Sequence, residues 1–539
     1  MNRPGLLLAL LAALAFVALE AHAAQWYMSP TGRSNGNGSI TDPWDIVTGF
    51  GHPGSVHAGD TLWLRGGTYL IRGNLISYLT GTANAPILVR QYPRERAILD
   101  AGDSVNNRVF IQGAYCWHWG YELMSSGLRR WGDAARGYGI DFGNSSPARG
   151  LKLINLVQHD TEGAFGFWRN AIDGEIYGCL IYYNGYDSTD RGHGHAIYAQ
   201  NDSGTKRMAD NIMFGQYSHG IHAYGSSAAY LNHFLVEGNI SFHNGITSTI
   251  SGFTRNILVG GGRLAEDPRV LNNYAYFNPA SGGGTSCDLG YGQGVSHAVV
   301  QDNYLVGGGL AFNFGSSTTT DTISGNTFCG PVSGADSLRF PNNIYYGTRR
   351  PTGVRVFVRP NQYEPGRGNL CVFNWDNRDT VTADVSAILS PGDLFVVQDA
   401  QNFFGPPVLS GTYDGNPIRL PLNLTAVAPV IGSPARQFVH TPKEFNAFVL
   451  MRTGRVGVEE KEGLKSQGLG IRLTARPNPF TSFTSVPGYS SDRFVLYDIS
   501  GRRVGFYKGD RIGEGLAPGV YFIRSSGNKD KPLRIVKVR

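Results

Sequence analysis

Polar and apolar positions alternate in short stretches between Asn155 and Asn326, and each stretch ends at a polar turn. One Asn or Gly recurs in each repeat, and we take these residues as markers of successive coils: Asn155, Gly178, Gly215, Asn239, Asn273, Asn303 and Asn326. Their spacing centres on about two dozen residues with longer insertions, which is typical of a solenoid of short strands. Asn and Gly suit a point where the chain turns through a left-handed conformation. The pattern therefore predicts a parallel β-helix.

Two alternating strands separated by Gly-rich turns precede these repeats. Their sequences are Ala-Gly-Asp-Thr-Leu-Trp-Leu-Arg-Gly-Gly-Thr-Tyr at residues 58–69 and Gly-Thr-Ala-Asn-Ala-Pro-Ile-Leu-Val-Arg at residues 81–90. Together with residues 26–32, these strings resemble the opening of right-handed β-helix proteins of the pectate-lyase-like superfamily. The resemblance implies an all-β chain with a right-handed parallel β-helix and N-terminal cap over residues 24–346. It also implies a polysaccharide ligand.

The pattern changes after residue 346. Short strands separated by Pro-Gly, Asp-Asn and Asp-Gly turns fill residues 347–451, which predicts a β-sandwich domain. This part loosely resembles the β-rich accessory domains of carbohydrate-active proteins. Residues 452–470 are charged and contain glycine, as expected of a linker, and residues 471–539 predict a further small β domain.

Three motifs follow one another in this last domain. They are Ala-Arg-Pro-Asn-Pro-Phe at residues 475–480, Tyr-Asp-Ile-Ser-Gly-Arg-Arg-Val at 497–504 and Leu-Ala-Pro-Gly-Val-Tyr-Phe-Ile-Arg at 516–524. The motifs resemble the Ig-like C-terminal sorting domain of the type IX secretion system and its relative in flagellar hook-capping proteins. The resemblance implies secretion machinery as a partner and export or surface attachment, with no part in catalysis.

The first residues indicate an exported protein. A single positive charge at Arg3 precedes an apolar run over residues 6–19, and the small residues of Ala21-His22-Ala23 follow. The run is shorter than the ~20 residues that span a bilayer, so we expect residues 1–23 to be a removed signal peptide. The protein is then secreted or displayed on the cell surface.

Composition narrows the partners. The chain of 539 residues has a formal net charge of +6, which suits an acidic ligand without requiring one and is too diffuse to indicate nucleic acid. Its five cysteines are widely spaced and form neither a CxxC pair nor a disulfide framework. We interpret them mostly as small buried apolar residues.

Two adjacent coils carry the clearest candidate chemistry. Ile197 and Ile221 are separated by one coil length, so we expect them to stack inside the β-helix. With that register, four alternating positions point outward together: Tyr198, Gln200, His222 and Tyr224. Aromatic and polar groups in a groove along one outer sheet would bind a sugar chain. The alternative is a ladder of stacked polar side chains with a structural role.

Two further histidines come just before these positions. Strict alternation turns His195 and His219 inward, and they reach the outer face only if the strand starts after them, at a corner, which Gly194 and Gly220 allow. Earlier coils are expected to add Asp141 and either Trp168 or Arg169 to the same face.

The reaction depends on which groups join this face. Elimination from a uronate needs a base for the C5 proton, a group that neutralises the carboxylate and an acid for the leaving oxygen. Lys206 or Arg207 would supply the base or the neutralising charge, although a solvated turn pair is the alternative. His222 or Tyr198, with His195 and His219 beside them, would exchange protons. We therefore favour a polysaccharide lyase acting on an acidic glycan.

Two alternatives stay open. Hydrolysis needs two carboxylates, and the candidates near the face are Asp187, Asp190 and Asp202, which do not form the paired pattern of β-helix polygalacturonases. The other alternative is a non-catalytic surface protein that binds glycans or has a structural role.

No cofactor is certain from the sequence. Calcium, which many β-helix lyases bind through acidic clusters, is kept as a candidate, with Asp187 and Asp190 as a suggestive pair. Four histidines within thirty residues, His193, His195, His219 and His222, could also bind a transition metal, and His193 and His195 have strand spacing that would point both rings the same way.

Overall fold

The computed structural model describes residues 23–132, 136–144, 148–227, 229–250, 254–278, 284–314, 320–456, 480–486, 493–498, 502–525 and 533–538. The chain divides into two compact units, Met1–Glu460 and Lys461–Arg539. Residues 1–22 of the predicted signal peptide, 457–470 of the predicted linker and the motif at 475–479 lie outside the described residues. The domain boundaries given above therefore stay predictions.

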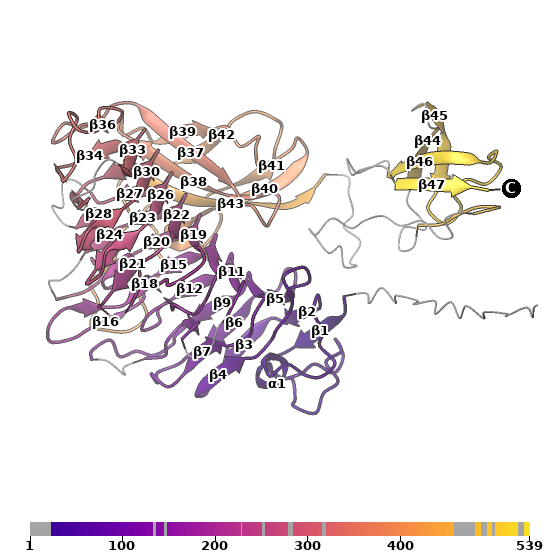
Figure 1. Ribbon diagram of the computed structural model, residues 1–539, viewed down its shortest axis with the longest axis horizontal. Helices are drawn as coiled ribbons and strands as arrows, with labels where there is room; N and C mark the ends of the chain where they lie inside the picture. Colours follow the sequence, from indigo (N-terminus) through magenta and orange to yellow (C-terminus); the bar gives the residue numbers. More distant parts are fainter. Residues whose placement is uncertain are drawn as a thin grey trace, which may run out of the picture. The chain divides into compact units, whose positions relative to one another are not determined.

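Three long parallel sheets form the β-helix of the first unit (Figure 1). Sheet 1 contains β1 (Gln25–Met28), β2 (Thr61–Leu64), β5 (Ile87–Gln91), β8 (Cys116–Trp119), β11 (Lys152–Ile154), β14 (Glu175–Tyr177), β19 (Lys206–Ala209), β22 (Phe234–Glu237), β26 (Arg269–Leu271), β30 (Val299–Gln301) and β33 (Thr322–Ser324). Sheet 2 contains β4 (Asn74–Ser77), β7 (Arg108–Ile111), β10 (Ile140–Phe142), β13 (Phe165–Phe167), β18 (His195–Ala199), β21 (His219–Gly225), β24 (Arg255–Gly261), β28 (Thr285–Gly292), β32 (Gly309–Phe312) and β35 (Val332–Ser333). Sheet 3 contains β3 (Gly67–Leu70), β6 (Ala97–Asp100), β9 (Glu122–Met124), β12 (Val157–His159), β15 (Leu180–Tyr182), β20 (Ile212–Phe214), β23 (Ile240–Phe242), β27 (Tyr274–Tyr276), β31 (Tyr304–Val306), β34 (Thr327–Cys329) and β36 (Ile344–Tyr345).

Short elements decorate the coils. The helix α1 (Ile46–Phe50) lies in the N-terminal cap. Two small pairs, β16 (Tyr186–Asp187) with β17 (Gly192–His193) and β25 (Ala265–Glu266) with β29 (Val295–Ser296), form in loops. No helix among the described residues is both long and apolar enough to span a bilayer. The predicted all-β class is confirmed.

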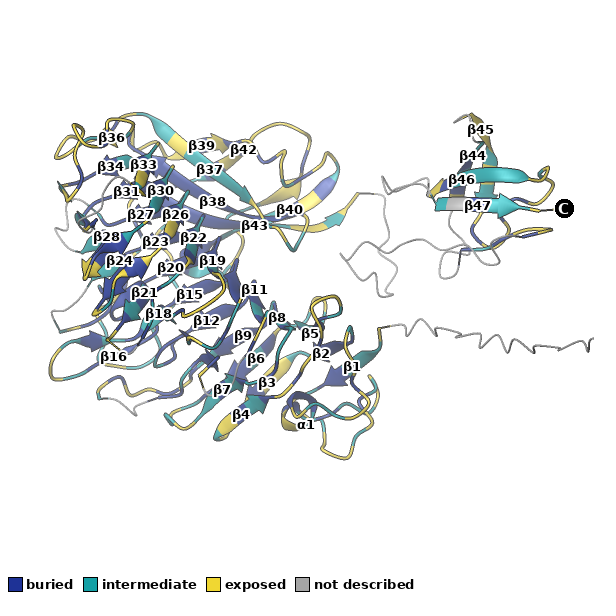
Figure 2. Cartoon of the chain, in the orientation of Figure 1, coloured by how far each residue is buried: buried dark blue, intermediate teal, exposed yellow. Residues whose placement is uncertain are grey.

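Apolar residues at alternate strand positions, one or two per strand, fill the interior of the β-helix, as Figure 2 shows by the buried strands. Ile176, Met208 and Val236 stack in this way in sheet 1, because the parallel register places them at the same height in successive coils. All five cysteines are buried and unpaired, as predicted.

A ladder of asparagines fixes the corner between sheets 1 and 3. The side-chain amide of Asn239 donates to Asn273 at 3.0 Å, and that of Asn273 donates to Asn303 at 3.0 Å. These side chains are buried, so the ladder satisfies polar groups that would otherwise be costly to bury. The left-handed residue is the one before, for example Asn272 with φ 54°. Our expectation that the marker asparagines themselves adopt the turn conformation therefore holds for Asn155, with φ 52°, and is wrong for Asn239, Asn273, Asn303 and Asn326. The expected hydrogen bonding along the stack is confirmed.

One coil marker was also wrong. Tyr177 pairs with Ala209 in sheet 1, so Gly178 corresponds to Asp210 and not to Gly215. Gly215 follows β20 in sheet 3 and also has a positive φ, of 60°. The sequence pattern did not separate these two corners, because a glycine satisfies the same backbone requirement at each.

An antiparallel sheet packs against the outer face of sheet 3. It has the order β37 (Val354–Pro360), β38 (Arg367–Asn374), β43 (Phe445–Arg455), β40 (Asp393–Asp399) and β41 (Leu409–Thr412), and β39 (Thr380–Ala383) pairs separately with β42 (Ile418–Pro421). A short 3-10 turn spans Ala400–Asn402. Phe445 stacks on Tyr276 with 4.5 Å between ring centroids. The β-helix and this sheet therefore share an apolar core.

Part of sheet 1 is covered as well. Arg359 donates from Nε to Asp210 at 2.7 Å, and the Asn155 amide donates to Glu364 at 2.7 Å. Tyr363 lies edge-on to Tyr177 at 5.0 Å.

The second unit is a four-stranded antiparallel sheet in the order β45 (Arg503–Lys508), β44 (Arg493–Asp498), β46 (Gly519–Ser525) and β47 (Leu533–Lys537). Phe494, Leu496 and Ile523 are fully buried in its own apolar core.

Candidate functional site

The predicted register of the two central coils is confirmed. In sheet 2, Ile197 pairs with Ile221 and Tyr198 with His222. Both isoleucines are fully buried. Tyr198 and His222 are half-buried on the outer face, because alternate residues of a strand point to opposite faces.

Three histidines converge on this face. The ring centroids of His195 and His222 lie 4.5 Å apart, those of His219 and His222 lie 4.2 Å apart, and those of His195 and His219 lie 5.3 Å apart. A turn precedes His195, as predicted: Gly194 has φ +103°, and a Cβ there would lie 2.3 Å from the backbone of Gly185. The expectation that the strands start after the two histidines is wrong, because His195 and His219 are the first residues of β18 and β21. We call His195, His219 and His222 the histidine trio.

Hydrogen bonds position the rings of the trio. His222 Nδ1 lies 3.4 Å from His195 Nε2, and His219 Nδ1 lies 2.6 Å from the hydroxyl of Ser218. His195 Nδ1 is buried and has no hydrogen-bond partner among the described residues.

The trio is neutral at ordinary pH. Burial holds the pKa of each ring well below its usual value of 6.5, and the neighbouring imidazoles lower it further. Arg191 and Arg255 lower the pKa of His219 and His222 in the same direction. A neutral imidazole keeps a lone pair that can accept a proton or bind a metal ion.

Tyr198 stands beside the trio. Its ring lies 5.4 Å from that of His222, and its hydroxyl donates to the carbonyl of Tyr224 at 3.4 Å. The amide of Gln200 donates to the same hydroxyl at 3.1 Å. Burial raises the pKa of Tyr198, so its phenol stays protonated and is a proton donor. The structure thus brings together the four outward residues that the register predicted.

Earlier coils extend the face, as the sequence indicated. Trp168 lies 5.1 Å from Tyr198 and donates from its indole nitrogen to Asp141 at 2.8 Å. Gly166 occupies the position between Asp141 and Tyr198, and a Cβ there would lie 1.9 Å from the Asp141 carboxylate. The missing side chain makes room for the Asp141–Trp168 contact. Arg169 is exposed next to Trp168.

Two ion pairs on sheet 2 were not found from the sequence. Arg108 lies 3.5 Å from Asp141, and Arg255 donates to Asp288 at 2.8 Å. The register places Arg255 next to His219. A pocket of about 330 Å³ adjoins Arg255 and Asp288. The coils on this side have unequal lengths, so a fixed spacing could not locate these residues.

Lys206 and Arg207 do not reach the trio, and their predicted place at the edge of the groove is wrong. Both lie on β19 of sheet 1. Lys206 is fully buried, its ammonium donates to the carbonyls of Phe167, at 3.1 Å, and Trp168, and burial lowers its pKa well below the usual value.

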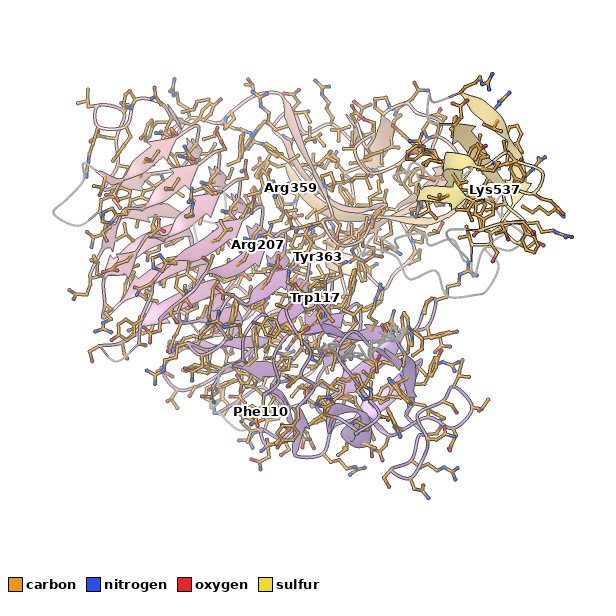
Figure 3. The ribbon with its side chains drawn as sticks, turned by 45° about the vertical axis from the view of Figure 1, so that its right-hand side comes forward. Phe110, Trp117, Arg207, Arg359, Tyr363 and Lys537 are labelled. Atoms are coloured by element: carbon orange, nitrogen blue, oxygen red, sulfur yellow. The ribbon has the colours of Figure 1, made fainter. Side chains whose placement is uncertain are left out.

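Arg207 points outward from sheet 1. It contacts Glu175 and pairs with Glu237 at 3.3 Å. Figure 3 shows Arg207 close to Tyr363 and Arg359, beside the antiparallel sheet. Lys206 and Arg207 follow β18 closely in the sequence, but they lie on β19 in sheet 1, whereas the trio lies on sheet 2. Closeness in the sequence was therefore a poor guide to their position.

His193 is separate from the trio. Its ring lies 2.9 Å from Asp190 and stacks on Tyr186 at 5.1 Å. The expectation that His193 and His195 share a metal is therefore wrong, because Gly194 turns the chain between them.

The acidic candidates do not form a calcium site. Asp187 is fully buried and accepts hydrogen bonds from the Ser248 hydroxyl at 2.5 Å and the Thr249 backbone at 2.8 Å. Asp190 is paired with His193, and Asp202 is exposed. Within the described ranges, the donor set that converges is three imidazoles, and Ca²⁺ requires oxygen ligands. The residues present do not fit calcium.

The fold and this face define a parallel β-helix with a polar and aromatic outer sheet. Residues 26–286 match the family model described as "Pel9A-like, right handed beta helix region". This match supports the predicted right-handed β-helix and its place in the pectate-lyase-like superfamily.

Individual proteins are similar over parts of the chain. A pectate lyase, PEL9, from Emericella nidulans is 37% identical over 78 residues, which cover 14% of this chain and 18% of that protein. The crystal structure of pectate lyase Pel9A is 17% identical with a TM-score of 0.44, covering 61% of this chain and 81% of its own. A rhamnogalacturonan lyase is 16% identical with a TM-score of 0.45, covering 56% and 87%. A lacto-N-biosidase from Eubacterium ramulus is 15% identical with a TM-score of 0.38, covering 60% and 67%.

Proposed function

We propose that the protein is a polysaccharide lyase that cleaves an acidic, uronate-containing glycan by β-elimination on the outer face of sheet 2. The observation that carries the proposal is the convergence of a neutral imidazole, a protonated phenol and arginine side chains on one sheet of a Pel9A-like β-helix. These are the three kinds of group that elimination requires.

The binding step follows from the stacking of the coils. Successive strands of sheet 2 are about 4.8 Å apart, which is close to the rise of a sugar unit along an extended glycan. Trp168 and Tyr198 are half-buried and present ring surface to the chain, and aromatic rings stack well on sugar faces. Arg255, next to the trio, is paired with Asp288 at 2.8 Å, and in this proposal its guanidinium also donates to a uronate carboxylate.

The chemical step assigns one role to each group. A lone pair of His222 accepts the C5 proton of the uronate. The carboxylate of the uronate lies against Arg255, which stabilises the negative charge that develops on that carboxylate. The bond between C4 and the leaving oxygen breaks, a C4–C5 double bond forms, and the phenol of Tyr198 protonates the leaving oxygen. Transfer of the proton from His222 to Tyr198 restores both groups. No water is consumed.

The test is an assay of the purified mature protein against uronate and neutral polysaccharides. Elimination produces an unsaturated product with ultraviolet absorbance together with new reducing ends, and we expect both from an acidic glycan. New reducing ends without that absorbance would indicate hydrolysis. Retention on an immobilised glycan without any product would indicate the non-catalytic alternative.

We also propose that the protein is secreted or attached to the cell surface, with the signal peptide and the C-terminal domain as its two export signals. Support comes from the sequence motifs and from the separate core of the second unit. A chain that ends at residue 456 should fold and remain in the periplasm of the native host. Normal export of that shortened chain would contradict the sorting role.

A further inference from the structure

The histidine trio has the composition of a metal site. The three side chains place one nitrogen each within 4.8 Å of one another, and they come from two adjacent strands of a rigid sheet. Imidazole is a common ligand of Zn²⁺, Co²⁺, Ni²⁺ and Cu²⁺, and three such ligands with one open position are typical of catalytic zinc sites.

The distances within the trio suit a small divalent ion. Two nitrogens bound at about 2.1 Å to one tetrahedral ion lie about 3.4 Å apart, and the contact between His222 Nδ1 and His195 Nε2 is 3.4 Å. The rings of His219 and His222 are stacked with 12° between their planes, so one of them must tilt to direct its lone pair at the same ion.

The surroundings prepare His219 for this role. Its Nδ1 lies 2.6 Å from the Ser218 hydroxyl. Metal-binding histidines usually hold such a partner at their other nitrogen, and it fixes the ring orientation.

We propose that His195, His219 and His222 form a binding site for one late first-row transition-metal ion, with Zn²⁺ and Co²⁺ as probes. A bound ion uses the lone pairs of the trio, so it competes with the proton that His222 accepts. This second part, inhibition of elimination by the metal, rests on the proposed function. The binding itself does not.

The experiment uses the mature protein without a polyhistidine tag, freed of metal by a chelator. Titration with Co²⁺ followed by visible absorption, and with Zn²⁺ followed by calorimetry, should show one ion per chain. His195→Gln, His219→Gln and His222→Gln should each weaken binding by at least about tenfold, and melting temperatures identify any variant that fails to fold. His195 and His222 are half-buried, so their variants keep the test open if the buried His219 variant unfolds.

His193→Gln is the matched control, because His193 lies two residues from His195 and pairs instead with Asp190. Its metal affinity should equal that of the wild type, and Ca²⁺ should not displace Co²⁺. The proposal is overturned if no saturable binding occurs, if folded variants of His195 and His222 bind as tightly as the wild type, or if His193→Gln abolishes binding.

Activity measurements separate the two proposals. Zn²⁺ should inhibit elimination, and a chelator should restore it. If zinc binds at the trio and turnover is unchanged, His222 is not the proton acceptor and the metal site stands. If zinc binds and the protein forms no unsaturated product from any glycan, the proposed function fails and the metal site stands.

Discussion

The outer faces of sheets 2 and 3 both carry aromatic ladders, yet they are used differently. On sheet 3, Tyr182 stacks on Phe214 at 5.2 Å and Phe214 on Phe242 at 5.0 Å, and all three are buried beneath the antiparallel sheet. On sheet 2, the ladder of Trp168 and Tyr198 leads into the histidine trio, and its rings remain half-buried. The same coil geometry thus produces an interface where the ladder is apolar and a candidate site where it is polar.

The difference shows where stability and function reside. Each ring on sheet 3 packs against another ring and is shielded from water, so truncation of one of these side chains leaves a cavity. The rings of sheet 2 meet polar neighbours and solvent, so truncation there removes chemistry with little effect on the core. The predictions below test this separation.

The largest effect is expected from His222→Gln. Loss of the proton acceptor should lower kcat on the acidic glycan by about 10²- to 10⁴-fold, while the melting temperature stays close to that of the wild type. Initial rates of absorbance increase, with thermal unfolding as the control, measure both. A folded variant with wild-type turnover would remove His222 from the mechanism.

Phe445→Ala should show the opposite behaviour. Phe445 is fully buried and contacts Tyr276, Phe242 and Phe373, and its loss should lower the free energy of unfolding by about 3–5 kcal/mol. Urea titration measures this. The folded fraction should keep the kcat of the wild type, and a loss of kcat at low temperature would show that the two faces are coupled.

Acid should weaken the sheet 3 side through His243. Burial lowers the pKa of this ring to about 4 from 6.5. Between these two pH values His243 is protonated in the unfolded chain and neutral in the folded chain. The free energy of unfolding is therefore unaffected by His243 above pH 6.5, and it falls by up to about 3 kcal/mol as the pH drops toward 4. Urea titrations between pH 7 and pH 4.5 should show a smaller decline in His243→Gln than in the wild type. Equal declines would contradict the neutral buried state.

The smallest expected effect is a difference in KM between variants of two arginines, Arg255 and Arg207. Arg255→Ala should raise KM for the acidic glycan by about tenfold, less so in high salt, because the charge next to the trio is lost. Arg207→Ala should leave KM unchanged and lower the free energy of unfolding by about 1 kcal/mol, since Arg207 is a partly exposed ion-pair residue on sheet 1. The ratio of the two KM values is the measurement, and equal values would place the glycan on another face.

The fold and the centre of the site were predictable because they depend on local pattern. The spacing of Ile197 and Ile221 gave the register, and alternation then placed Tyr198 and His222 on one face. Lys206 was wrongly assigned to this face, because neither a place in the groove nor a solvated turn, the two readings of the Lys-Arg pair, indicated a buried position on sheet 1. Its burial depends on the carbonyls of a coil 38 residues away. Arg255 and Asp288 were missed because loops of unequal length separate their coils from the trio.

The asparagine ladder makes the fold tolerant of changes in chain length. Successive rungs from Asn211 to Asn343 are separated by 28, 34, 30, 23 and 17 residues, yet each amide-to-amide hydrogen bond measures 2.8–3.0 Å. Each coil is anchored at one rung, so an insertion or deletion elsewhere in the coil changes a loop and leaves the stacking intact. Loops that border sheet 2 can therefore be lengthened, shortened or exchanged to reshape the groove while the scaffold beneath them stays in register.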